Sequence, residues 1–415
     1  MEYPRLRPLE IFPVEHQGKR LLCLRDPHGH LEAPLFLPID LISVLQHLDG
    51  TNSLRDIQAA YFRQYGQLLY TEQIEALVQE LDQALLLESD HFRSVVAERQ
   101  AAFKRLTVRP TSLAGRAYPK EPAALGRQLT KLFTAPGGPG SLPADGGQPD
   151  GRLAAIVAPH IDFARGGPCY AHAYKALQES CGASCFVILG TCHRPTSQPF
   201  IVTRKAFQTP LGVVPTDGGF IDSLQARVDG DLSAEEIAHR DEHTIECQVV
   251  FLQYLRAGRQ PFRIVPILVS SFHEAIVSGT SPMAMEPIGQ FIEALRETLD
   301  EEPGVVCLVA SADLAHVGPQ FGDPAPLGQS DWDRVRQEDL ALMEHAVAAD
   351  AEEFFQEMVA QGDRNRICGF PPIYTLLAAL EEGVEGDLLN YGQWPGPYGT
   401  VTYASLTYVR PKVTG

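Results

Sequence analysis

The chain has 415 residues, of which 44% are hydrophobic and 21% charged, so it has the composition of a globular protein and the length for about two hydrophobic cores. Its 52 acidic and 34 basic side chains give a formal net charge of −18, which argues against non-specific binding to nucleic acid or to an anionic membrane, because both require a basic surface. No apolar run approaches the ~20 residues of a membrane-spanning helix, and the N-terminus lacks the apolar segment of a signal peptide, so we expect a cytoplasmic protein.

The first module, about residues 1–90, is predicted to be a small α+β domain. Residues 10–26 have apolar stretches on both sides of a polar turn, a pattern that predicts a β-hairpin. Ser53 and Thr71 are suitable N-caps for the second and third of the helices that we expect next. Apolar residues recur at helical spacing in three stretches, 37–50, 54–66 and 71–89. A hairpin followed by three short helices indicates a winged-helix-like fold.

Part of this module resembles PqqD-like domains, small peptide-recognition domains of peptide-modifying enzymes. The stretch LDGTNSLRDI (48–57) is similar to that family's turn into its second helix. The resemblance implies recognition of a peptide, and a helical accessory or oligomerisation domain is the alternative. DNA binding is disfavoured because residues 55–67 carry too few basic side chains to neutralise many phosphates.

A connecting helix or linker is expected at 91–109, and the larger module, 110–415, is predicted to have an α/β fold. Within it, residues 134–151 are dense in Gly and Pro and predict an exposed loop. Four apolar runs of strand length lie at 153–159, 184–190, 262–271 and 304–311. Their apolarity is continuous, which indicates strands buried on both faces. Helical patterns separate them, so we expect a central mixed or mainly parallel sheet flanked by helices.

Chemically active side chains follow several of these predicted strands. His160 and Asp162 follow the first, His193 follows the second, and Asp313 and His316 follow the fourth. A single histidine at a strand end usually belongs to the core or the surface. Several of them at the carboxyl edge of one sheet, where α/β folds usually bind ligands, indicate a functional site.

Two further segments contribute candidate residues. Cys368 lies at the predicted start of a helix, where thiol pKa values fall. His243 and Glu246 are three residues apart, so on a helix they share one face and could hydrogen-bond to metal ligands or substrate. Alternatively, this segment is a solvated helix start in which Asp241 and Glu242 interact with the helix dipole.

These residue types favour a metal site. Imidazole and thiolate suit Fe, Cu or Zn, and three protein ligands with open positions are typical of a catalytic centre. The alternative is a cysteine hydrolase in which Cys368 is the nucleophile and His316 or His243 is its base. That mechanism leaves the histidines at the other strand ends unused, so the metal site is the preferred hypothesis.

The larger module resembles the MEMO family, which in prokaryotes is called AmmeMemoRadiSam system protein B. The resemblance covers about residues 110–410. The similar stretches, in the family's order, are LAGRAYP (113–119), IVAPHIDFARGGPCYAHAYK (156–175), VILGTCHRP (187–195), RDEHTIECQVVFLQYL (240–255), RIVPILV (263–269), VASADLAHVG (309–318), ICGFPPI (367–373) and LLNYGQ (388–393).

This resemblance implies a fold similar to that of class III extradiol dioxygenases, which use non-haem iron to open catechol rings. It implies a site for Fe(II) or Cu, with Zn as an alternative, formed by His160, His193 and Cys368. The pocket residues that it implies are His243, Asp313 and His316. His243 or His316 would then transfer protons.

Two positions depart from the pattern of many family members. Where others have Ala-Gly-Tyr, this chain has residues 161–163, Ile-Asp-Phe. Asp162 is therefore predicted to be a fourth ligand, a proton acceptor, or a hydrogen-bond acceptor that orients His160. Where others have two adjacent histidines, Arg194 follows His193. Arg194 is predicted to bind an anionic group of the substrate, with pairing to the acidic surface as the alternative.

The leading hypothesis is a metal-dependent, dioxygenase-like oxidoreductase that acts on a small or peptide-borne substrate. The alternative is a non-catalytic adaptor that binds metal or a peptide in a degenerate dioxygenase pocket. The family name further implies AMMECR-type and radical-SAM proteins as partners.

Overall fold

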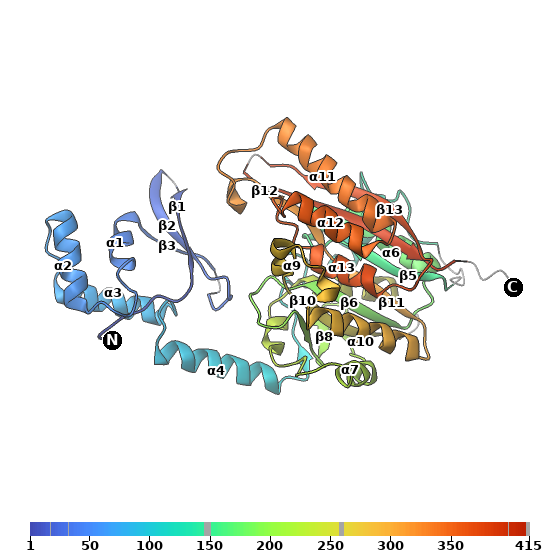
Figure 1. Cartoon of the computed structure of the whole chain (residues 1–415), viewed down its shortest axis with the longest axis horizontal. Helices are drawn as coiled ribbons and strands as arrows, with labels where there is room; N and C mark the ends of the chain where they lie inside the picture. The colour runs from blue at the N-terminus through green and yellow to red at the C-terminus, as the bar shows by residue number, and fades with distance from the viewer. Residues whose placement is uncertain (17, 32, 145–150, 257–260, 397, 412–415) are drawn as a thin grey trace. The chain divides into compact units, whose positions relative to one another are not determined.

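The computed structural model divides into two compact units, Met1–Arg105 and Leu106–Gly415 (Figure 1). None of the described helices is both long and apolar enough to span a bilayer. The residues that the structure describes are 1–16, 18–31, 33–144, 151–256, 261–396 and 398–411. Residues 145–150 of the predicted Gly/Pro-rich loop therefore lie outside the described residues.

The smaller unit packs a three-stranded antiparallel sheet, in the order β1-β2-β3, against short helices. The hairpin expected at 10–26 is confirmed by the pairing of β1 with β2. The elements are β1 (Glu10–His16), β2 (Lys19–Arg25), β3 (Leu35–Pro38), α1 (Ile42–Leu45), α2 (Leu54–Tyr65), α3 (Thr71–Gln83) and α4 (Asp90–Arg105), with a 3-10 turn, η1 (Ile39–Leu41), between β3 and α1.

The observed helix boundaries in this unit match the predicted N-cap of α2 and differ from the predictions for the other two helices. Ser53 caps α2, and its hydroxyl accepts a hydrogen bond from the amide of Asp56. Thr71 is the first residue of α3 rather than its cap, which is Tyr70. The helix expected at 37–50 is shorter than predicted: residues 39–45 form η1 and α1, whereas Leu37 and Pro38 belong to β3, which pairs with β2. Pro38 disfavours helical backbone at the residue before it.

The larger unit is built on an eight-stranded mixed sheet with the order β12-β14-β5-β11-β6-β10-β7, in which β13 pairs with β14. The four predicted strands are confirmed as β5, β6, β10 and β11, and they pair in parallel at the centre of the sheet. The strands are β5 (Leu153–Ala158), β6 (Cys185–Thr191), β7 (Phe200–Val202), β10 (Arg263–Val269), β11 (Val306–Ser311), β12 (Asp313–Val317), β13 (Glu385–Trp394) and β14 (Thr400–Val409).

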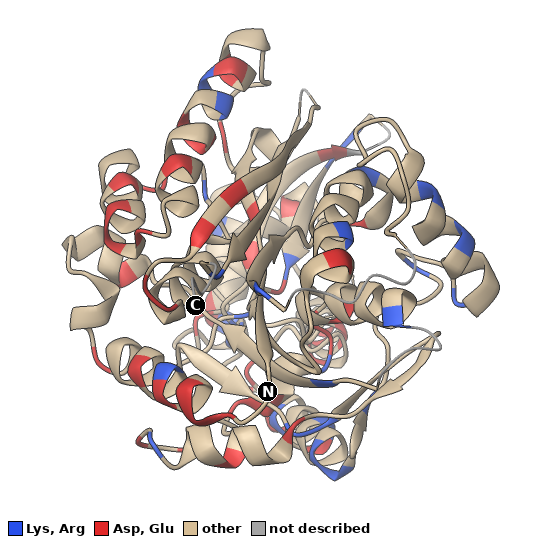
Figure 2. Ribbon diagram, turned by 90° about the vertical axis from the view of Figure 1, so that its right-hand side faces the viewer, with Lys and Arg blue, Asp and Glu red and all other residues tan. Residues whose placement is uncertain are grey.

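Helices cover both faces of this sheet, and each face has its own hydrophobic core. Side chains of α7 (Gly218–Gln225), α9 (His273–Ser278), α10 (Ile288–Glu301), α11 (Gln329–Val347), α12 (Ala351–Gln361) and α13 (Phe370–Ala379) pack on one face. Side chains of α5 (Pro122–Thr134), α6 (Phe163–Ser180) and α8 (Thr244–Arg256) pack on the other. Figure 2 shows charged residues on many of these helices and few on the central strands. The α/β fold expected for this module is confirmed.

Short elements complete the unit. A small sheet has the order β4-β8-β9. Its strands are β4 (Val108–Arg109), β8 (Ala206–Thr209) and β9 (Gly212–Val214), and the 3-10 turns are η2 (Glu236–His239), η3 (Pro282–Ala284) and η4 (Pro319–Phe321). The antiparallel strands β13 and β14 form a hairpin. Neither strand was predicted from the sequence.

One carboxyl group in this core is expected to titrate near neutral pH. Asp339, on α11, is fully buried, and the hydroxyl of Tyr391 on β13 donates to its Oδ2 at 2.7 Å. Burial raises the pKa of Asp339 to about 7, although hydrogen bonds from Thr402 and Tyr391 oppose the rise. The folded chain therefore keeps a proton here at pH values at which the unfolded chain has lost it.

We expect this proton to make stability depend on pH. A folded-state pKa of about 7, above the unfolded value, means that the free energy of unfolding falls as pH rises from about 4 to about 7. The free energy of unfolding of Asp339→Asn should equal that of the wild type at pH 4 and exceed it at pH 8, by at most about 4 kcal/mol. Urea unfolding at the two pH values measures this difference. An equal difference at both would contradict the prediction.

Candidate metal centre

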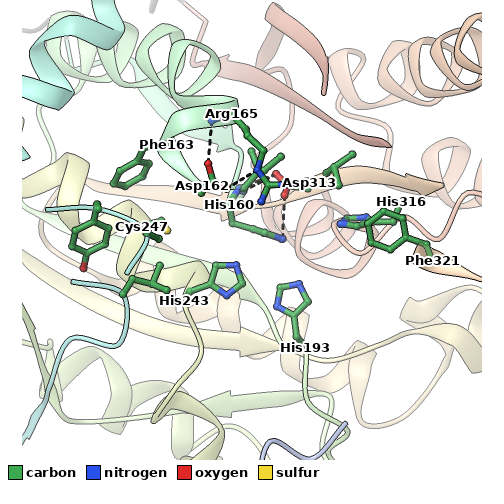
Figure 3. Close-up of a pocket in the computed structure, with 15 residues that line it drawn as sticks. His160, Asp162, Phe163, Arg165, His193, His243, Cys247, Asp313, His316 and Phe321 are labelled. Carbon is green, nitrogen blue, oxygen red and sulfur yellow. Dashed lines mark hydrogen bonds and ion pairs between the residues drawn. The ribbon is translucent and has the colours of Figure 1, made fainter. Parts of the chain in front are cut away.

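Three histidines meet at the carboxyl edge of the central sheet (Figure 3). His160 follows β5, His193 follows β6, and His243 immediately precedes α8. One ring nitrogen from each lies within 4.8 Å of the others, and no second group of this kind occurs in the described part of the chain. The ring centroids are 5.0 to 5.5 Å apart. Parallel pairing of the strands brings the first two together, and the start of α8 adds the third.

The hydrogen bonds of these rings determine which nitrogen is free. The Nδ1 atom of His160 donates to the carbonyl of Ser311 at 3.1 Å. The Nδ1 atoms of His193 and His243 both face the Glu242 carboxylate, at 3.1 and 3.0 Å from Oε1. Carbonyl and carboxylate oxygens only accept, so His160 and His193 carry a hydrogen on Nδ1, and in the neutral form each ring keeps its Nε2 lone pair. This is the arrangement expected of metal-binding imidazoles, and the residues fit a transition-metal ion. Burial opposes protonation of His193, but the charge of Glu242 and the contact with Cys368 raise its pKa.

Cys368 lies beside this group, just before α13. Its Sγ is 3.4 Å from Nε2 of His160, and it also hydrogen-bonds with His193. Burial raises the pKa of the thiol, although the contact with His193 opposes the rise. Gly369 permits this approach, because a Cβ there would lie 2.2 Å from the carbonyl oxygen of Asp313. The predicted ligands His160, His193 and Cys368 thus lie together, and their role as ligands stays a prediction.

The carboxylate that contacts His160 is Asp313. Its Oδ1 accepts from the backbone amides of His160 and Ile161 at 2.9 and 3.1 Å, and its Oδ2 is 3.6 Å from Nε2 of His160. Burial raises the pKa of Asp313. Asp162, predicted to act here, instead caps α6 by accepting from two backbone amides and pairs with Arg165.

His316 lies at the end of β12 and lines the same cavity. Its Nδ1 donates to the carbonyl of Leu314 at 3.0 Å, which leaves Nε2 as an acceptor. Burial lowers the pKa of His316, although the charge of Asp313 opposes the effect. The ring of Phe321 packs edge-on against it, with the centroids 5.1 Å apart. These contacts favour the neutral form of His316, with Nε2 as its acceptor.

The two predicted substrate-binding residues have other contacts. Arg194 pairs with Asp241 at 2.8 Å. Glu246 is fully buried and pairs with the equally buried Arg109. Burial opposes ionisation of Glu246, but the charge of Arg109 and several hydrogen bonds lower its pKa to about 2. Its carboxylate also accepts from Tyr118 and so holds a segment that forms one wall of the cavity.

A cavity of about 400 Å³ lies over the histidines. In Figure 3 the histidines and Asp313 lie between Phe163 on one side and Phe321, next to His316, on the other. The lining residues of the cavity are Leu113, Ala117, Tyr118, His160, Ile161, Asp162, Phe163, Arg165, His193, His243, Cys247, Asp313, His316, Phe321 and Val401. A volume of this size is in the range of small-molecule sites.

Sequence reasoning missed the residues that hold the site residues in place. Glu242 was noted only for its charge next to a helix start, although it contacts two of the histidines. Arg109 and Ser311 were not singled out. Only one signal was available, the acidic residue adjacent to a histidine in RDEH (240–243). The contacts themselves join segments far apart in the chain.

Known proteins similar to this chain cover most of it. The family model described as Memo-like protein matches residues 109–407. A MEMO1 family protein of Aquifex aeolicus is 30% identical over 98% of this chain and 99% of its own length. MEMO1 family proteins of Thermus thermophilus and Methanopyrus kandleri are 29% and 30% identical, over 80% and 73% of this chain and 90% and 99% of their own lengths. The crystal structure of the uncharacterized protein JW3007 from Escherichia coli K12 covers 62% of this chain and 99% of its own, at 13% identity and a TM-score of 0.37.

The buried Arg109–Glu246 pair is expected to be essential for folding stability. Arg109→Met would leave the Glu246 carboxylate buried without its cation, so the free energy of unfolding should fall by about 3–5 kcal/mol. The matched control is Arg194→Met, which removes a partly exposed pair with Asp241 and should cost less than about 1 kcal/mol. Urea unfolding of both variants checks this, and equal losses would contradict it.

Proposed function

The chain belongs to the Memo-like family, and we propose that it is a metal-dependent, dioxygenase-like oxidoreductase acting on a small or peptide-borne substrate. One observation carries the proposal. One ring nitrogen from each of three imidazoles lies within 4.8 Å of the others, in a cavity large enough for a small molecule. A thiol next to the imidazoles extends the donor set.

The donor set suits Fe(II) or Cu, with Zn as an alternative, because imidazole and thiolate are ligands for these metals. His160 and His193 would hold the ion, with Cys368 or His243 as the third ligand. When bound, such a metal supplies Lewis-acid and redox chemistry. A thiolate, which prefers Cu(I), also favours a second candidate, a metal-binding adaptor without catalysis.

The other residues of the cavity have roles that follow from their contacts. His316 would accept a proton at Nε2, since its Nδ1 is bonded to a carbonyl. Asp313 holds the backbone at His160 and so maintains the position of that ring. The side chains of Phe163, Tyr118 and Phe321 would pack on an apolar or aromatic substrate and exclude water.

The smaller unit has a separate proposed role. On its resemblance to PqqD-like domains, it would recognise a peptide that carries or accompanies the substrate. AMMECR-type and radical-SAM proteins stay predicted partners. Pull-down of the full chain and of Leu106–Gly415 with candidate peptides would test whether the smaller unit recognises a peptide.

Metal analysis tests the centre directly. Protein purified without chelator should carry about one Fe, Cu or Zn per chain, and His160→Ala should lose it, because it removes the most buried of the three imidazoles. His172→Ala is the matched control, since this histidine of α6 is not one of the three clustered rings and its Nε2 hydrogen-bonds with the carbonyl of Gly137. Cys368→Ala distinguishes the ligand sets, because full metal content in this variant would exclude the thiol as a ligand. A metal-free wild type would contradict the proposal.

Catalysis is tested by oxygen uptake with catechols. We expect turnover by the metal-loaded wild type, and a loss of about 10²–10⁴-fold in kcat for His316→Ala with unchanged metal content. Bound metal without oxygen uptake would favour the adaptor. Full activity of His316→Ala would exclude this histidine as the proton acceptor.

A further inference from the structure

Glu242 is the one carboxylate that contacts two of the three clustered histidines among the described residues. It lies between η2 and α8, and its side chain is 4% exposed. Its Oε1 is 3.1 Å from Nδ1 of His193 and 3.0 Å from Nδ1 of His243. The two rings are nearly parallel, with an interplanar angle of 10° and centroids 5.1 Å apart. A single acceptor therefore holds both rings side by side.

The same carboxylate also binds the backbone on which these rings are mounted. Its Oε2 accepts from the amide of His193 at 2.9 Å, and its Oε1 accepts from the amides of His243 at 2.8 Å and Thr244 at 3.4 Å. A buried charge is costly unless hydrogen bonds compensate it, and here both oxygens have several donors. The group thus joins the end of β6 to the start of α8.

An ionised carboxylate accepts hydrogen bonds but donates none. A neutral imidazole that donates from Nδ1 to Glu242 therefore keeps its Nε2 lone pair for a ligand. His193 makes this hydrogen bond, and Nδ1 of His243 lies 3.0 Å from the same oxygen. His160 is held separately, by the carbonyl of Ser311. The orientation of two rings out of three thus depends on one side chain.

We infer that Glu242 is a positioning residue that sets the tautomer and orientation of His193 and His243 together, so that metal affinity depends on it. This inference rests on the proposed metal centre. It holds whether Cys368 or His243 completes the ligand set, because His193 belongs to both sets. Loss of hydrogen-bond partners of metal-binding histidines typically weakens metal binding by about 10–100-fold.

Cobalt(II) titration of the metal-free full chain, followed by visible absorption, tests the inference. Glu242→Gln keeps the shape of the side chain but has one acceptor oxygen in place of two, so we expect about 10–100-fold weaker binding and a changed absorption spectrum. Asp241→Asn is the matched control, because that neighbouring carboxylate pairs with Arg194 and Arg240 instead of the histidines. It should bind cobalt as the wild type does.

A second variant covers the case in which Glu242→Gln does not fold. Glu242→Asp keeps the charge but is one methylene shorter, so it cannot reach both rings, and it should also bind more weakly with a shifted spectrum. Urea unfolding confirms that the variants compared are folded. Wild-type affinity and spectrum in the folded variants would overturn the role of Glu242 while the centre stands. A wild type that does not bind cobalt would overturn the proposed function itself.

Discussion

The parallel pairing of β5, β11 and β6 is the constraint on which the rest of the site depends. Ser311, the last residue of β11, lies opposite Ala158 of β5 on one side and Gly190 of β6 on the other. Because neighbouring strands are about 4.8 Å apart, the residues that follow these three positions reach a common point. His160, His193 and Asp313 are those residues. The cluster is thus a consequence of strand register rather than of any local motif.

Close packing of a helix on the same edge completes the arrangement. A Cβ at Gly190 would lie 2.6 Å from the hydroxyl of Thr244, so the glycine allows α8 to approach the sheet. The hydroxyl of Thr244 donates to the carbonyl of Thr191 at 2.9 Å, which fixes the start of α8 at the end of β6. This contact places His243, the residue before Thr244, next to the other two histidines.

Electrostatic compensation around the cavity is local, although the chain carries a net charge of −18. Glu242 is compensated by imidazole and backbone donors, and Glu246 by Arg109 and the hydroxyls near it. The first arrangement positions the rings, and the second holds one wall of the cavity. Each buried acid therefore orders a different part of the same site.

The sequence by itself determined the α/β class, the four central strands, the Ser53 cap and the candidate residues at the strand ends, since these depend on apolar periodicity and on residues close together in the chain. Only the tertiary structure decided which carboxylates contact the histidines. Asp313 rather than Asp162 contacts His160, and Glu242 contacts His193 across 49 positions. The contacts of Asp313 with His160 and of Glu242 with His193 depend on register and packing between distant segments, which residue spacing along the chain does not give.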